Sequence, residues 1–109
     1  MRRFGAMLNT LFVPPAGLNA ITTDDTPICR CEEVTAGEVR AAVAQGAVTV
    51  DALKAWTRVG QGPCQGRTCG PILARLIAGC TVGSPADAGL FPVLPPVKPV
   101  PIASLAKGG

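Results

Sequence analysis

The sequence predicts a small all-α fold of three short helices around a four-cysteine site, with extended, irregular flanks at both ends. Three observations lead to this prediction. Helix-start signals and helical spacing of apolar residues are confined to residues 28–80. All five cysteines lie in the same stretch. The chain has 109 residues, of which 13 are glycine and 11 proline, so one small domain with irregular flanks is expected.

The N-terminal flank, residues 1–27, is predicted to be an irregular segment that docks on a partner. Two arginines precede an apolar stretch over residues 4–13, and two prolines end it. This order has the shape of an export signal, but Asn9 and Thr10 interrupt the short stretch, so we expect a cytoplasmic protein. No segment reaches the roughly 20 apolar residues of a membrane span.

The first predicted helix begins with a capping box. Thr35 is the expected N-cap, and Glu38 stands three residues later. Val39 and Val43 are four residues apart and share one face, and the helix is expected to end near Gln45.

The second predicted helix is short and is capped by Thr49 or Asp51. Leu53 and Trp56 lie three residues apart and are expected on its buried face. The sequence Gly-Gln-Gly-Pro at residues 60–63 ends the helix and opens a glycine-rich loop.

The third predicted helix covers residues 68–78, with Pro71 in its first turn, where no N–H is needed. Apolar pairs four residues apart indicate its buried side, namely Ile72 with Leu76 and Leu73 with Ile77.

The C-terminal flank, residues 81–109, is predicted to be an extended tail. Six prolines between Pro85 and Pro101 favour polyproline II. Eight large apolar residues accompany them, and such a strip would promote aggregation if it stayed in water. The tail is therefore expected to lie on a partner surface.

The cysteines fall into two close pairs, Cys29-x-Cys31 and Cys64-x₄-Cys69, while Cys80 stands apart and is expected to be a small buried side chain. Four interpretations compete: a [2Fe–2S] cluster, a structural zinc site, two disulfides, or inert free thiols. Disulfides need an oxidising compartment, and zinc usually prefers Cys-x₂-Cys spacing.

The surroundings of the second cysteine pair favour an iron–sulfur cluster. Gly66 and neighbouring glycines allow the main chain to approach the sulfurs and donate N–H groups to them. A four-thiolate diferric cluster carries a charge of about −2, which Arg30, Arg58 and Arg67 could offset.

Several functions are excluded by composition. The chain has no histidine and no tyrosine, which leaves few candidate general acids or bases, so it is not expected to be catalytic on its own. Its net charge of +3 is too small to indicate a nucleic-acid partner.

Three stretches together resemble the [2Fe–2S] domain related to bacterioferritin-associated ferredoxin: CRCEEVTAGEVR at 29–40, LKAWTR at 53–58 and GPCQGRTCG at 62–70. The resemblance implies that Cys29, Cys31, Cys64 and Cys69 are the cluster ligands. The free-standing ferredoxin has two residues between its last two cysteines, whereas this chain has four. The longer spacing is more similar to the domain of FAD-dependent opine, proline or hydroxyproline dehydrogenases and of hydrogen cyanide synthase. There the domain is a C-terminal fusion or a separate small (gamma) subunit.

The resemblance implies an iron–sulfur subunit of a hetero-oligomeric flavin dehydrogenase that oxidises an opine or a related secondary amine or imino acid. A larger partner subunit would hold FAD or FMN, and the cluster would relay electrons or stabilise the assembly. An autonomous bacterioferritin-associated ferredoxin and a structural four-cysteine zinc module remain alternatives.

Overall fold

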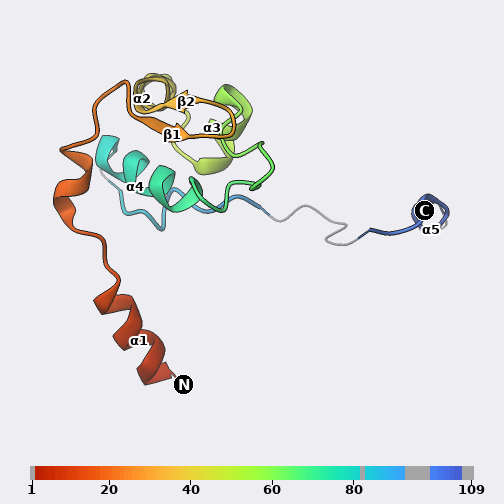
Figure 1. Ribbon diagram of the computed structural model, residues 1–109, viewed down its shortest axis with the longest axis horizontal. Coiled ribbons are helices and arrows are strands. Elements are labelled where there is room, and N and C mark those ends of the chain that lie inside the picture. The colour runs from red at the N-terminus through yellow and green to blue at the C-terminus, as the bar shows by residue number, and fades with distance from the viewer. Residues whose placement is uncertain (1, 82, 93–98, 107–109) are drawn as a thin grey trace.

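Three helices and a small hairpin form one body in the computed structural model, which describes residues 2–81, 83–92 and 99–106. Figure 1 shows α2, α3, α4 and the hairpin packed together, with α1 and α5 lying away from them near the two ends of the chain. The elements in order are α1 (Arg2–Leu11), the 3-10 helix η1 (Ala16–Asn19), β1 (Pro27–Cys29), β2 (Val34–Thr35), α2 (Ala36–Ala44), α3 (Val50–Thr57), α4 (Gly70–Cys80) and α5 (Ile102–Leu105).

The three predicted helices are present, and their starts follow the capping signals. The capping box of α2 is complete: the Thr35 N–H donates to the Glu38 carboxylate at 2.8 Å, and the Glu38 N–H donates to the Thr35 hydroxyl at 3.4 Å. Thr49, rather than Asp51, caps α3 by accepting the Ala52 N–H at 3.1 Å. The third helix, α4, has Pro71 in its first turn as predicted.

A two-stranded antiparallel hairpin is an addition to the predicted all-α fold. β1 pairs with β2 through Pro27 opposite Thr35 and Cys29 opposite Val34. Strands of three and two residues are too short to show the alternation that identifies a strand in sequence. The turn between them includes Glu33 in a left-handed conformation (φ 54°) and carries Cys31.

The core lies between α2, α3 and α4, and its largest fully buried side chains include Leu53, Leu73, Ile77, Val39, Val50 and Val59. The predicted burial of Trp56 is wrong, because its side chain is 55% exposed. α3 ends at Thr57, and Val59 follows the turn at Arg58 and completes this side of the core.

Cys80 is exposed, which corrects the prediction of a buried thiol. The buried face of α4 ends at Ile77, so the last turn of the helix projects past the core. Ile72 is also half exposed, whereas the other three members of the two predicted apolar pairs are buried.

The N-terminal flank is more regular than predicted. Residues 2–11 form α1, on which the spacing of Phe4, Met7 and Leu11 is helical, and all three side chains are at least half exposed. At η1 the flank is held against α4, because Arg75 donates to the Pro15 carbonyl at 3.1 Å and Asn19 donates to the Arg75 carbonyl at 3.3 Å.

The C-terminal flank begins by packing on the domain. Ala88 is buried, and its carbonyl accepts the Val50 N–H at 2.9 Å. Further along, α5 is a single helical turn in a tail that was predicted to be extended throughout. The predicted extended conformation of residues 93–98 lies outside the described residues. None of the helices described is long and apolar enough to cross a membrane.

Candidate metal centre

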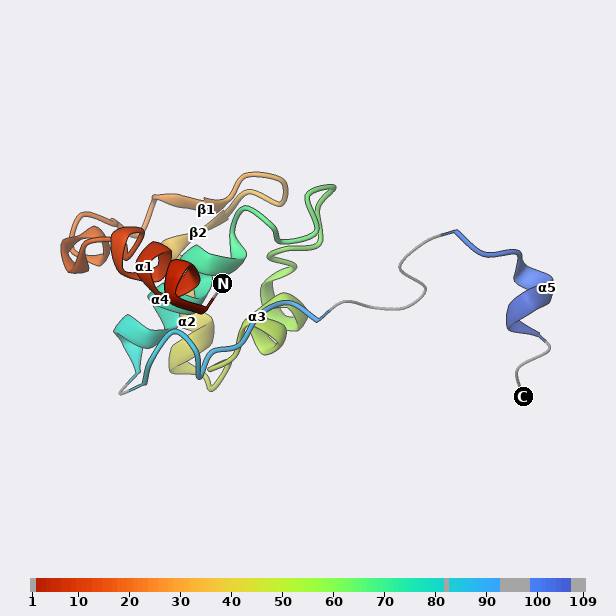
Figure 2. The ribbon, with the colours of Figure 1, turned by 90° about the horizontal axis from the view of Figure 1, so that it is seen from below.

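Two loops bring the four paired cysteines to one side of the domain. Cys29 ends β1 and Cys31 lies in the hairpin turn, while Cys64 and Cys69 come from the loop between α3 and α4. Figures 1 and 2 both show the hairpin turn beside the α3–α4 loop. Two segments more than thirty residues apart in sequence therefore meet at this edge.

The thiols meet across the loops as an outer and an inner pair. The Sγ atoms of Cys31 and Cys64 are 3.9 Å apart near the surface. Cys29 and Cys69 are neighbours in the interior, with 2% and 1% of their surface exposed. In the part of the chain that the structure describes, no three potential ligands converge into a finished metal site. Four thiols are the ligands that a [2Fe–2S] cluster requires, and two of them already meet across the loops.

Gly62 allows the two loops to approach each other. A Cβ atom on this residue would lie 2.1 Å from the Cβ of Cys31, well inside van der Waals contact. Any side chain at position 62 would push the hairpin turn away from the α3–α4 loop. The contact between Cys31 and Cys64 therefore depends on a glycine at this position.

The loop backbone stabilises the thiolate of Cys64. N–H groups of Thr68 and Gly66 donate toward this sulfur and lower its pKa to about 7. Gln65 and Gly66 both adopt positive φ angles, 52° and 75°, which turn the backbone around the sulfur. The Gly66 N–H thus points at a cysteine sulfur, as expected from the sequence.

The pKa of the Cys69 thiol is shifted in the opposite direction to that of Cys64. Burial, followed by the neighbouring Cys29, raises the pKa of the Cys69 thiol to about 12. This thiol is therefore protonated at neutral pH in the metal-free chain, and a metal must displace its proton to bind the sulfur. Cys69 precedes α4, where the helix dipole favours the anion that results.

The three arginines near the cysteines occupy different positions. The Arg58 Nε donates to the Glu32 carboxylate at 3.1 Å, which joins the α3–α4 loop to the hairpin turn. Arg67 donates to the Gln65 side chain at 3.0 Å and to the Cys64 carbonyl at 3.5 Å. Arg30 is exposed in the turn.

Two residues at the site were not found from sequence. Glu32 pairs with Arg58, but a carboxylate beside a cysteine carries no distinguishing signal. Phe91 packs against the glycines of the α3–α4 loop, whereas in the sequence it is only one apolar residue of the tail.

The state of Cys64 predicts selective alkylation of the metal-free chain at pH 6.5. A thiol of pKa about 7 is then about one quarter ionised, against about one per cent for an ordinary thiol. After correction for the lower nucleophilicity of the more acidic thiol, Cys64 should react with iodoacetamide about five times faster than an ordinary exposed thiol. Peptide mass spectrometry measures this rate, with the exposed Cys80 as internal reference. Equal rates at Cys64 and Cys80 would contradict the described loop geometry.

Comparison with known proteins places the cysteine region in a described family. The family model for the BFD-like [2Fe–2S] binding domain matches residues 27–79. This range contains both cysteine pairs and the three packed helices, apart from the last residue of α4. No solved structure gave a significant match to the chain.

Three curated proteins illustrate the relationship. The chain is 43% identical to the A subunit of opine oxidase from Rhizobium meliloti (strain 1021) over 101 residues, which are 92% of this chain and 22% of that protein. It is 39% identical to the A subunit of opine oxidase from Agrobacterium tumefaciens (strain Ach5) over 102 residues, which are 93% of this chain and 20% of that protein. It is 53% identical to the HcnB subunit of hydrogen cyanide synthase from Pseudomonas aeruginosa over 45 residues, which are 41% of this chain and 10% of that protein.

The matches to the opine oxidase subunits cover almost all of this chain but only a small part of each relative. The chain spans about a fifth of the length of the opine oxidase subunits that it matches. Those matches cover more than nine tenths of this chain, so they extend beyond residues 27–79 into both flanks. The flanks are therefore shared with the longer relatives together with the cysteine region.

Proposed function

Because residues 27–79 belong to the family of BFD-like [2Fe–2S] binding domains, we propose that Cys29, Cys31, Cys64 and Cys69 hold a [2Fe–2S] cluster. The observation that best supports this ligand set is the meeting of the two loops, with Cys31 and Cys64 3.9 Å apart. The exposed Cys80 lies at the far end of α4 and takes no part.

The residues around the thiols have distinct tasks in this proposal. When bound, the cluster supplies one-electron redox chemistry. The N–H groups of Gly66 and Thr68 stabilise negative charge on the Cys64 sulfur. The salt bridge from Arg58 to Glu32 keeps the hairpin turn against the α3–α4 loop. Cys31 and Cys64 form the more accessible side, where electrons would enter or leave.

We propose that the chain acts as the iron–sulfur part of an oxidoreductase assembly whose larger subunit binds FAD or FMN. The relatives are described as subunits of an opine oxidase and of hydrogen cyanide synthase, and the chain spans only a small part of each. The substrate proposed is an opine or a related secondary amine or imino acid, oxidised at the flavin. The cluster held by the four thiols would either relay electrons from the flavin or stabilise the assembly.

The flanks provide the surface for such a partner. Phe12 and Val13 in the N-terminal flank and Leu90 in the tail are each more than two thirds exposed. They line an apolar groove of about 780 Å³ that also includes Pro71 and Ala74 of α4. A free-standing carrier has no need of this surface, which favours the assembly over an autonomous ferredoxin. Free thiols throughout the chain suit the cytoplasm as its compartment.

Anaerobic addition of the substrate to the purified assembly tests electron transfer. If the cluster relays electrons, an opine or imino acid should reduce it and produce a paramagnetic signal within the turnover time. Reduction of the flavin without any cluster signal would show that the cluster is structural. Reduction of neither centre would rule out this class of substrate.

A further inference from the structure

The aromatic ring of Phe91 lies directly on the loop that carries Cys64. A Cβ atom added to Gly60 would stand 2.3 Å from the ring atom Cζ, and one added to Gly66 would stand 2.0 Å from Cδ2. Both glycines have positive φ angles, 78° and 75°. The loop therefore fits against this ring only because two of its residues have no side chain.

Phe91 belongs to the tail, and the segment before it is fixed to the domain. Ser84 donates through its N–H to the Asp87 carboxylate at 2.7 Å, which closes a turn. The Ala88 carbonyl then accepts the Val50 N–H at the start of α3. Gly89 follows with φ 74°, and the chain leads to Phe91.

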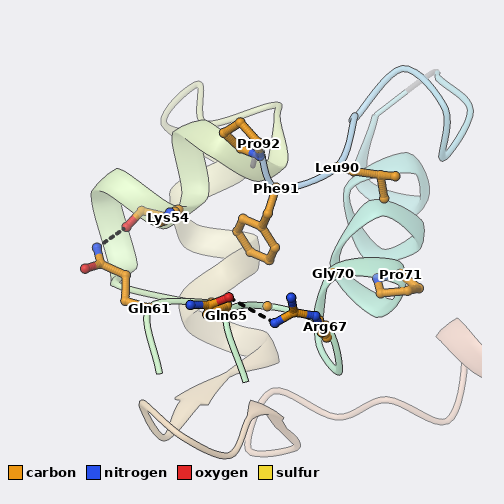
Figure 3. A pocket seen from close by; sticks show the side chains of 11 residues that line it. Lys54, Gln61, Gln65, Arg67, Gly70, Pro71, Leu90, Phe91 and Pro92 are labelled. Carbon is orange, nitrogen blue, oxygen red and sulfur yellow. Dashed lines mark hydrogen bonds between the residues drawn. The ribbon is translucent and has the colours of Figure 1, made fainter. Parts of the chain in front are cut away.

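A cation lies over the ring of Phe91. The Nζ atom of Lys54 is 5.9 Å from the ring centroid, a distance at which a cation and an aromatic face attract each other. Figure 3 shows Phe91 between Lys54 on α3 and the loop that carries Gln65 and Arg67. The ring thus joins the tail, α3 and the α3–α4 loop.

We propose that Phe91 is a positioning residue that holds the loop of residues 60–70 in the conformation that binds the cluster. The ring covers Gly66, whose N–H donates toward Cys64. It also supports a backbone turn in which the Gln65 N–H donates to the Gly62 carbonyl at 2.8 Å and the Gly70 N–H to the Gly66 carbonyl at 2.8 Å. Without the ring, water reaches these groups and the turn opens. This inference rests on the proposed role of Cys64 as a ligand.

The test compares Phe91→Ala with Phe91→Leu and with the control Leu90→Ala in the full chain. Leu90 is the preceding residue and is 73% exposed, so its substitution changes the tail without removing a contact to the loop glycines. We expect Phe91→Ala to lose the cluster to a chelator about tenfold faster than the unsubstituted chain, the lower end of what supporting residues contribute at metal sites. Phe91→Leu should recover most of the difference, and Leu90→Ala should match the unsubstituted chain.

Hydrogen exchange gives a readout that needs no cluster. In the metal-free Phe91→Ala chain, peptides within residues 60–70 should exchange faster, while peptides of α2 should be unchanged. A uniform increase would show a general loss of stability and would overturn the positioning role. Unchanged exchange and an unchanged rate of cluster loss would overturn the inference as well.

A double substitution tests the contact between the ring and Gly66 independently, and Phe91→Leu replaces Phe91→Ala in it if the alanine variant is poorly folded. Gly66→Ala alone should greatly increase the rate of cluster loss and the hydrogen exchange of residues 60–70, because its Cβ meets the ring. When Gly66→Ala is combined with Phe91→Ala, the combined effect on these readouts should be smaller than the sum of the two single effects, because the added Cβ no longer meets a ring. Additive effects would show that the ring and Gly66 are not in contact. A chain that never binds iron would disprove the proposed function, whereas the exchange and double-substitution results would still decide the role of Phe91.

Discussion

Replacing either Cys31 or Cys64 by alanine should remove the iron from the purified chain, from about two atoms per chain to near zero. These two thiols form the cross-loop pair with the 3.9 Å sulfur–sulfur distance, so each substitution leaves its partner without a counterpart on the opposite loop. Iron analysis and visible absorption measure the loss. The domain should also lose stability, because metal binding and folding are coupled in so small a core.

Cys80→Ala is the matched control for this prediction. It removes the same atoms from a cysteine that is exposed at the end of α4, and its iron content should equal that of the unsubstituted chain. Full iron content in Cys64→Ala, or loss of iron in Cys80→Ala, would show that the ligand set is wrong. The same comparison applies to Cys29 and Cys69, although their burial makes a folding defect the larger concern.

Two truncations of the tail should have different consequences. Removing residues 93–109 leaves the contacts of Ala88 and Phe91 intact, so the cluster should remain while affinity for the flavoprotein falls about tenfold or more. Removing residues 83–109 also deletes Ala88, which bonds to α3, and Phe91, which packs on the α3–α4 loop. This longer truncation should lose the cluster as well as the partner.

Co-purification with the flavoprotein and iron analysis of the same samples separate these outcomes. Circular dichroism checks whether the overall helix content is retained in both truncated chains. If the chain without residues 93–109 still co-purifies at full yield, that part of the tail does not bind the partner. If the chain without residues 83–109 keeps its iron, the packing of the tail on the loop is not needed for the cluster.

Local signals in the sequence accounted for the helices well. The Thr35 and Glu38 capping box rests on hydrogen bonds within four residues, so residue identity and spacing were sufficient to predict it. For the next helix the sequence left two alternative caps, and the structure has Thr49. The two cysteine pairs were likewise recognised from their close spacing in the sequence. That the two pairs would form one ligand set was implied by the family resemblance, since no local rule connects loops so far apart, and the contact of Cys31 with Cys64 is a finding of the structure.

Features that depend on packing between distant segments were missed. The exposure of Trp56 and Cys80 reflects where the core ends, which helical periodicity does not specify. The hairpin has strands too short for a pattern. Phe91 and Gly66 fit each other across the domain, whereas in sequence a phenylalanine among prolines indicates only a surface for another protein. These misses concern tertiary contacts, whereas α1 and α5 are local conformations in the flanks that were also not predicted from the sequence.

The central claim is that four thiolates from the two facing loops hold a [2Fe–2S] cluster. The most direct measurement is iron, zinc and acid-labile sulfide analysis of the anaerobically purified chain, followed by EPR spectroscopy after reduction. We expect about two irons and two sulfides per chain and a spin-one-half signal that appears on one-electron reduction. One zinc per chain, with no visible absorption and no EPR signal, would contradict the claim and identify a structural zinc module instead.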